Sequence, residues 1–314
     1  MAEKLISVVT PCYNEEANVE EVYLRVKEVF DKFKKYQYEH IFIDNASSDK
    51  TVHVLKDIAK KDRRVKIIVN TRNFGAIRSS YYGLIQPKGD AAILIFADLQ
   101  DPPSLIQDFL EKWAEGYKVV KGIKISSKEN FLLYSLRTFY YRLINKLSDD
   151  VKLSSHFTGF GLYDKCVIEA LRTIDDPYPY LRGLISELGF ESVEVEYKQE
   201  RRKRGISSNN FYSLYDTAML GLTSHSRVPL RLATLLGFVL SILCLFIAVA
   251  SLITKLLFWN YFPVGIAAII IGLFALASVQ LFFIGILGEY IGLMNMRILK
   301  RPIIVERERI NFDN

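Results

Sequence analysis

The sequence is poor in the residues that build disulfide frameworks and zinc sites, with 3 cysteines and 4 histidines among 314 residues. Cys12, Cys166 and Cys244 have neither disulfide-framework nor zinc spacing, and their number is odd. We therefore expect three reduced, incidental thiols. The chain also contains no internal repeat and no low-complexity segment.

The sequence also lacks two features that would assign it to other classes. Its first residues, MAEKLISVVTPCYNE, contain no apolar region of the signal-peptide kind, so we expect the large N-terminal part to stay in the cytoplasm. No nucleic-acid recognition module accompanies the net charge of +6, so no nucleic-acid partner is expected. A basic surface facing an anionic membrane leaflet explains this charge better.

Apolar residues, in contrast, make up 50% of the chain and are concentrated near its C-terminus. Residues 232–253 and 264–287 carry no charge, and each segment exceeds the roughly 20 residues that cross a bilayer core. Basic residues flank the pair on its outer sides, whereas the short loop between them holds only Lys255. These features predict a two-helix transmembrane hairpin in the inner (plasma) membrane, multi-pass, with both termini cytoplasmic and the lipid bilayer as a partner.

Ahead of the two segments, the apolar pattern alternates between strands and helices. Strands are expected at 5–10, 40–43, 65–69, 91–96 and 118–122, and helices at 17–35, 51–58, 76–84 and 104–114. This alternation predicts an α/β fold with a mostly parallel sheet and right-handed crossovers. Polar residues follow the strands, so we expect several loops to meet at the carboxyl edge, where α/β proteins bind ligands.

The clearest of these strand ends is AAILIFADLQDPP, residues 91–103. An apolar run stops there at Asp98, Gln100 and Asp101, before two prolines. Oxygen donors at such an edge suit Mg2+ or Mn2+, which could hold a diphosphate whose departure requires charge neutralisation. The alternative is a solvated acidic turn after a core strand.

Two basic segments are candidates for contact with the membrane surface. Arg201, Arg202 and Arg204 belong to a run of four cations just before an amphipathic segment at 211–222, where they could bind a lipid phosphate or form a solvated charge run. Arg137 lies in a second stretch that is both basic and aromatic. That stretch suits a surface near the bilayer or an amphipathic helix packed on the sheet.

In order and spacing, these motifs resemble those of the family 2 glycosyltransferases of GT-A fold. Within that family they are similar to the polyprenyl-phosphate sugar transferases, such as the bactoprenol glucosyltransferases and the dolichyl-phosphate mannose synthases. The matching segments are PCYNE at 11–15, DNASSDKT at 44–51, RNFG at 72–75, ADLQDPP at 97–103, GEYIG at 288–292 and RP at 301–302.

The resemblance implies a GT-A domain of Rossmann-like, mostly parallel sheet type at residues 1–210. A juxtamembrane amphipathic segment at 211–230, two transmembrane helices at 231–293 and a cytoplasmic tail at 294–314 would follow. The sequence leaves the oligomeric state open, a homo-oligomer included.

The resemblance also implies roles for individual residues. The nucleotide contacts would come from Pro11, Tyr13, Glu15, Asp44 and Arg72. Asp98 and Gln100, helped by Asp101, would hold Mg2+ or Mn2+, while Arg137, Arg201, Arg202 and Arg204 would orient the acceptor phosphate. The implied reaction is inverting transfer of a hexose from a nucleotide diphosphate sugar, such as UDP-glucose, to polyprenyl (undecaprenyl) phosphate at the cytoplasmic face, for cell-surface glycan assembly.

The chain departs from the family pattern at the site of a catalytic base. Where many relatives have an Asp and an Arg, the aligned positions are Gly159 and Gly161, and Phe96 replaces an acidic residue of the metal motif. His156 is a candidate replacement, so Asp98 and His156 are the candidate catalytic residues. A lipid monophosphate, with a second pKa of about 6, is already largely ionised and needs little proton abstraction.

Two other functions remain as alternatives. A non-catalytic membrane scaffold that binds nucleotide sugar would explain the missing base. A processive polysaccharide synthase is disfavoured, because the family's Gln-x-x-Arg-Trp motif is absent: neither Trp113 nor Trp259 follows an arginine.

Overall fold

The computed structural model describes residues 4–126, 154, 157–199, 219–220, 228–257, 266–299 and 301–312. Its strands are β1 (Leu5–Cys12), β2 (Gln37–Asp44), β3 (Val65–Asn70), β4 (Ala91–Leu94), β5 (Val119–Ser126), β6 (Phe157–Asp164), β7 (Ser192–Lys198) and β8 (Glu306–Ile310). Its helices are α1 (Val19–Lys32), α2 (Thr51–Lys61), α3 (Ala76–Leu84), α4 (Leu105–Ala114), α6 (Lys165–Arg172), α7 (Leu181–Glu187), α9 (Val228–Leu257) and α10 (Ile266–Ile298).

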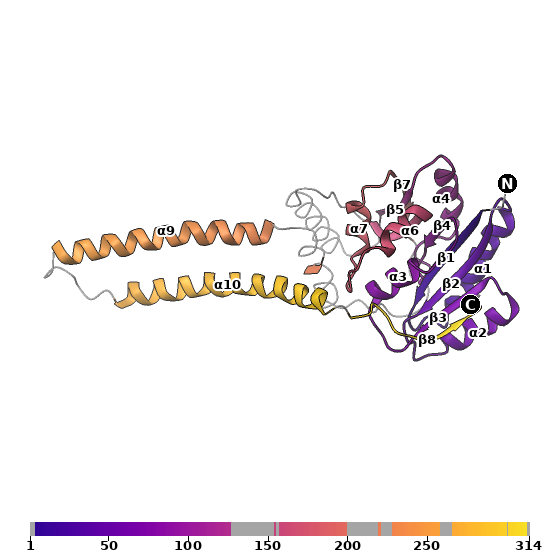
Figure 1. Ribbon diagram of the computed structural model, residues 1–314, viewed down its shortest axis with the longest axis horizontal. Coiled ribbons are helices and arrows are strands. Elements are labelled where there is room, and N and C mark those ends of the chain that lie inside the picture. Colours follow the sequence, from indigo (N-terminus) through magenta and orange to yellow (C-terminus); the bar gives the residue numbers. More distant parts are fainter. Residues whose placement is uncertain are drawn as a thin grey trace.

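The strands form one eight-stranded sheet in the order β7-β5-β6-β4-β1-β2-β3-β8 (Figure 1). β1 pairs in parallel with β2 and β4, and β2 with β3, which confirms the predicted parallel core. The sheet is nevertheless mixed, because β6 runs antiparallel between β4 and β5, and β8 runs antiparallel to β3. The parallel strands direct their carboxyl ends to one edge.

Alternating side chains of the strands build a core on each face of the sheet. Ile6 and Val8 of β1 pack toward α1 and α4. The next residue, Val9, points to the other face and packs toward α3, α6 and α7. This period of two is the one expected of strands buried on both faces. Helices therefore cover both faces and leave the carboxyl edge for the loops.

The last residues return from α10 to the sheet, and β8 lies beside β3 at its edge (Figure 1). Thr71 donates from its backbone N (3.0 Å) and its Oγ1 (3.1 Å) to the carbonyl of Val305, and Ile304 is buried. Asn311 Nδ2 donates to the carbonyls of Ala59 and Val65 at 2.9 Å each. The segment expected to be a tail thus includes a strand of the sheet.

Two long helices, α9 of 30 residues and α10 of 33, run side by side away from the sheet (Figure 1). They contain the described parts of both predicted apolar segments, and most of their described apolar side chains are exposed. By length and composition, one stretch of the described residues, Val279–Ile298, could cross a membrane. The basic segment around residue 137 and nearly all of the amphipathic segment at 211–222 lie outside the described residues.

We predict that Asn311→Ala loosens β8. The change removes two hydrogen bonds and puts alanine at a backbone φ of 59°, so local stability should fall by about 1–2 kcal/mol. Backbone amides of β8 should then exchange with solvent deuterium about 5 to 30 times faster.

Lys56→Ala serves as the control, because it removes the exposed ion pair to Glu308 of the same strand (2.6 Å). Exposed pairs contribute about 0–1 kcal/mol, so exchange should change little. Equal exchange in the two variants would contradict the assigned role of Asn311.

Candidate active site

Four polar loops meet at the carboxyl edge of the sheet, following β1, β2, β3 and β4. Hydrogen bonds join the first two: Asn14 N donates to Ser47 Oγ (2.9 Å), and Ser48 N donates to Asn14 Oδ1 (2.8 Å). Glu15 N donates to Thr51 Oγ1 (2.9 Å). The sequence motifs at 11–15 and 44–51 therefore form one structural unit.

Asn45 joins this unit to the third loop. Its Oδ1 accepts hydrogen bonds from Asn70 Nδ2 (3.1 Å) and from the backbone N of Phe74 (2.9 Å). Its Nδ2 donates to Asn73 Oδ1 (2.8 Å), which in turn accepts from the backbone N of Gly75 (2.8 Å). The buried side chain of Asn45 thus fixes the loop that leads into α3.

Asp44 ends β2 and is fully buried, with an exposed fraction of 0%. Its carboxylate accepts hydrogen bonds from the backbone N (2.9 Å) and the Oγ (2.5 Å) of Ser47. Burial raises the pKa of Asp44, and these hydrogen bonds offset part of that rise. Asp44 is therefore a strong acceptor held at the edge of the sheet.

The other expected nucleotide residues occupy different environments at the same edge. Glu15 is buried and accepts a hydrogen bond from Asn18 Nδ2 (2.5 Å), whereas the ring of Tyr13 is 38% exposed. Pro11 is half-buried. Arg72 is exposed in the third loop, with its guanidinium 4.0 Å from the ring centroid of Phe74.

In the fourth loop, Asp98 is half-buried, and its Oδ1 accepts from the backbone N of Gln100 (3.2 Å). Leu99, between them, adopts a φ of 57°. The second carboxylate oxygen of Asp98 has no hydrogen-bond partner within the described part of the chain. An unpartnered carboxylate oxygen next to an amide side chain fits a hard divalent cation.

Asp101 has a different environment from Asp98. Its carboxylate is buried and accepts a hydrogen bond from Tyr197 of β7, while Gln100 Oε1 accepts from Gln199 Nε2 (3.3 Å). Burial raises the pKa of Asp101. Asp101 therefore ties the loop to β7. Among the described residues, no group of three or more His, Cys, Asp or Glu side chains is placed to hold a metal ion. A cation at Asp98 would need further oxygens from its ligand.

Backbone geometry defines the positions aligned with the family's base and arginine. A Cβ on Gly161 would lie 2.3 Å from the carbonyl oxygen of Val120, so no other residue fits there. Gly159 has a φ of 102°, and its carbonyl accepts from Tyr163 Oη (2.6 Å). Neither position could take a charged side chain without a rearrangement of β6.

The remaining sequence candidates are His156, Arg137, Arg201, Arg202 and Arg204, all outside the described residues. Asn45 and Asn73 connect the loops, although the sequence alone assigned neither of them a role of its own. Their signal was present, since each follows an apolar strand within a polar run. It could not identify the partners, which lie 25 to 29 residues away from Asn45.

Comparisons with known proteins agree with this geometry. The model of the family described as Glycosyl transferase family 2 matches residues 7–172. The chain is 34% identical to YkcC, an uncharacterized glycosyltransferase of Bacillus subtilis (strain 168), over 98% of this chain and 95% of that protein. It is 33% identical to the bactoprenol glucosyl transferase of Shigella phage SfII, over 95% of this chain and 96% of that protein.

Among solved structures, the fold is similar to that of glucosyl-3-phosphoglycerate synthase from Mycobacterium tuberculosis in complex with Mn2+, UDP and phosphoglyceric acid. The TM-score is 0.51 at 19% identity, covering 71% of this chain and 77% of that one. This likeness supports the GT-A-like mixed α/β fold.

We predict that Asp44→Asn stabilises the ligand-free protein at neutral pH. Because the pKa of Asp44 is raised in the folded state, that state binds a proton more readily than the unfolded state between the two pKa values. The stability contributed by Asp44 is therefore full below the unfolded pKa and is lost as pH rises through the folded pKa.

An asparagine can keep the hydrogen bond from Ser47 N without carrying a buried charge. Thermal unfolding followed by circular dichroism should show a higher Tm for the variant at pH 7.5 and a smaller difference at pH 4. A variant that is less stable than the wild type at both pH values would contradict this account.

Proposed function

Because the chain belongs to glycosyl transferase family 2 and is a glycosyltransferase, we propose that it transfers one hexose from a nucleotide diphosphate sugar to a polyprenyl phosphate, with inversion. The relatives named bactoprenol glucosyl transferase support this acceptor, since the match covers nearly their full length, including the region of α9 and α10. On the same basis, the donor is a UDP-sugar such as UDP-glucose, and the acceptor is undecaprenyl phosphate.

One observation carries the proposal: the half-buried carboxylate of Asp98, with one oxygen unpartnered among the described residues, lies at the same sheet edge as the bonded loops that contain Asp44 and Glu15. Carboxylates accept hydrogen bonds from ribose hydroxyls or a base N–H. Asp44 and Glu15 bind the base and ribose, and the exposed ring of Tyr13 stacks on the base next to Pro11.

Asp98 and Gln100 are the residues that would hold Mg2+ or Mn2+. When bound, the ion neutralises the charge that develops on the departing nucleotide diphosphate. Asp101 has a positioning role, because the hydrogen bond that it accepts from Tyr197 holds the loop that contains Asp98. The glucosyl-3-phosphoglycerate synthase of similar fold binds Mn2+ and UDP.

The reaction needs little help from a protein base. A phosphate monoester with a second pKa of about 6 carries most of its second negative charge at pH 7, so it can attack the anomeric carbon directly. The protein's task is to hold that phosphate in line with the departing diphosphate. The glycines at 159 and 161 are compatible with this chemistry.

The acceptor requires access to a membrane. We propose that α9 and α10 form the transmembrane hairpin, with the sheet domain and both termini at the cytoplasmic face. The product, a polyprenyl-phosphate sugar, would then form at that face for cell-surface glycan assembly.

We predict that Asp98→Asn lowers transfer at least a hundredfold, because it removes the charged metal ligand. The assay measures release of UDP from UDP-glucose by the detergent-solubilised full chain, with undecaprenyl phosphate and Mn2+. Asp108→Asn is the matched control, since this carboxylate lies on α4, after the same loop. It should keep wild-type activity.

Two outcomes would contradict the proposal. Full activity of Asp98→Asn would remove its metal role. Binding of UDP-glucose by the wild type without release of UDP, across a panel of nucleotide sugars, would indicate a binding protein in place of a transferase.

A further inference from the structure

Arg78 lies in the first turn of α3, on the face of the sheet opposite α1, and Arg72 lies in the loop before that helix. Arg78 of α3 lies with its guanidinium 4.8 Å from the ring centroid of Tyr178, and its Nε is buried without a hydrogen-bond partner in the described part of the chain. Burial lowers the pKa of Arg78, and the nearby charges of Arg72 and Arg301 lower it further. The charges of Arg72 and Arg301 thus act on a guanidinium that lies against Tyr178.

The acid beside Arg78 is already paired. Asp176 accepts from Arg297 of α10 (3.0 Å) and from the backbone N of Tyr178 (2.9 Å). Neither Arg78 nor Arg301 forms an ion pair within the described residues. The arginine cluster, Arg72, Arg78 and Arg301, therefore carries an excess positive charge that a bound anion would neutralise.

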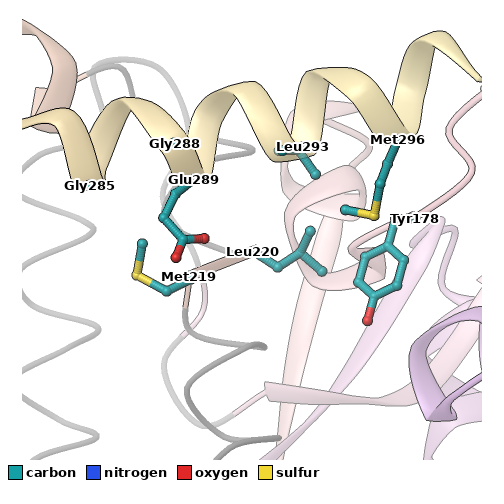
Figure 2. Close-up of a pocket in the computed structure, with 9 residues that line it drawn as sticks. Tyr178, Met219, Leu220, Gly285, Gly288, Glu289, Leu293 and Met296 are labelled. Atoms are coloured by element: carbon teal, nitrogen blue, oxygen red, sulfur yellow. The ribbon is translucent and has the colours of Figure 1, made fainter.

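A cavity of about 560 Å³, lined mostly by apolar side chains and glycines, adjoins the cluster. One face of α10 lines it with Gly285, Gly288, Gly292, Leu293 and Met296, and Tyr178 closes the end near Met296 (Figure 2). Glu289 lines the cavity about two helical turns from Met296. Tyr178 links Arg78 to the cavity, because its ring lies against the Arg78 guanidinium and the same residue lines the cavity.

We propose that the arginine cluster binds the phosphate of the prenyl monophosphate acceptor, and that the cavity holds the isoprene units next to it. The proposal rests on the proposed function. An acceptor lipid fits better than a bulk phospholipid because Arg72 belongs to the loop fixed by Asn45 at the donor site. A phosphate held by this arginine lies beside the sugar donor.

The chemistry of the two parts matches the two parts of the ligand. Guanidinium groups bind phosphate oxygens through paired, charge-assisted hydrogen bonds. The three glycines of α10 leave room for a branched chain, because a Cβ at each would meet no atom within 4 Å. The cavity is lined by the C-terminal half of α10. That end of the helix is the one nearest the sheet domain (Figure 1), and a lipid of the proposed membrane would enter there.

The first test compares Arg78→Gln with Arg25→Gln in the detergent-solubilised full chain. Arg25 lies on α1, on the opposite face of the sheet, and is paired with Glu21. Both variants replace an arginine by glutamine, so they change the net charge equally. Arg78→Gln should weaken binding of farnesyl phosphate about tenfold or more and raise the KM for undecaprenyl phosphate similarly, leaving the KM for UDP-glucose unchanged. Arg78→Lys should restore part of the affinity.

The second test fills the cavity. Gly288→Leu should weaken farnesyl phosphate binding but leave binding of inorganic phosphate unchanged, because it blocks the chain and spares the cluster. Gly272→Leu on the same helix is the control, since it has equal space and lies outside the cavity. It should bind both ligands like the wild type.

The outcomes separate the two proposals. If the wild type transfers sugar but Arg78→Gln behaves like Arg25→Gln, the site is overturned and the function stands. If the wild type transfers nothing, binding decides: loss of farnesyl phosphate binding in Arg78→Gln supports the site, and no binding by the wild type overturns it. Equal loss of affinity for phosphatidylglycerol and farnesyl phosphate would indicate a general lipid contact and overturn the acceptor assignment.

Discussion

The pairing of β8 with β3 is the contact that holds the C-terminal end of α10 near the sheet. The strand follows α10 after a few residues, so the bonds that fix β8 also limit where the helix can end. The ion pair between Arg297 and Asp176 adds a second attachment, but a partly exposed pair contributes little by itself. Burial of Ile304 and the backbone bonds of β8 therefore carry most of the attachment.

With α10 held there, groups of opposite charge lie on neighbouring parts of the domain. The carboxyl edge holds Asp44 and Asp98, whereas Arg78 lies on the face covered by α3, with Arg72 in the loop that leads into this helix. Asn45 connects these two regions, because its side chain fixes the loop that contains Arg72 and leads into α3. In the proposed reaction, this separation lets a cation and carboxylates hold the donor while guanidinium groups hold the anionic acceptor. The two negatively charged substrates could then approach each other without an unshielded contact.

The sequence predicted the parallel core well, because each of its strands is an apolar run followed by a polar turn. The predicted helix at 76–84 has the observed bounds of α3, and the loops at 44–51 and 97–103 lie at the predicted edge. β6 was missed because its glycines interrupt the apolar pattern, and β8 because ERERI carries alternating charges. Arg78 received no role from the sequence. Only the tertiary structure brings it to Tyr178, 100 positions away.

The glycine at 161 shows why a departure from the family pattern involves more than one side chain. β6 approaches β5 so closely at this point that any Cβ would clash with the carbonyl of Val120. An arginine there would require a different β5–β6 register, and β5 also pairs with β7. β7 carries Tyr197, whose bond to Asp101 holds the loop of Asp98. The glycine, the strand register and the candidate metal loop are therefore coupled, so restoring the family residue at position 161 alone would disturb the loop it was meant to assist.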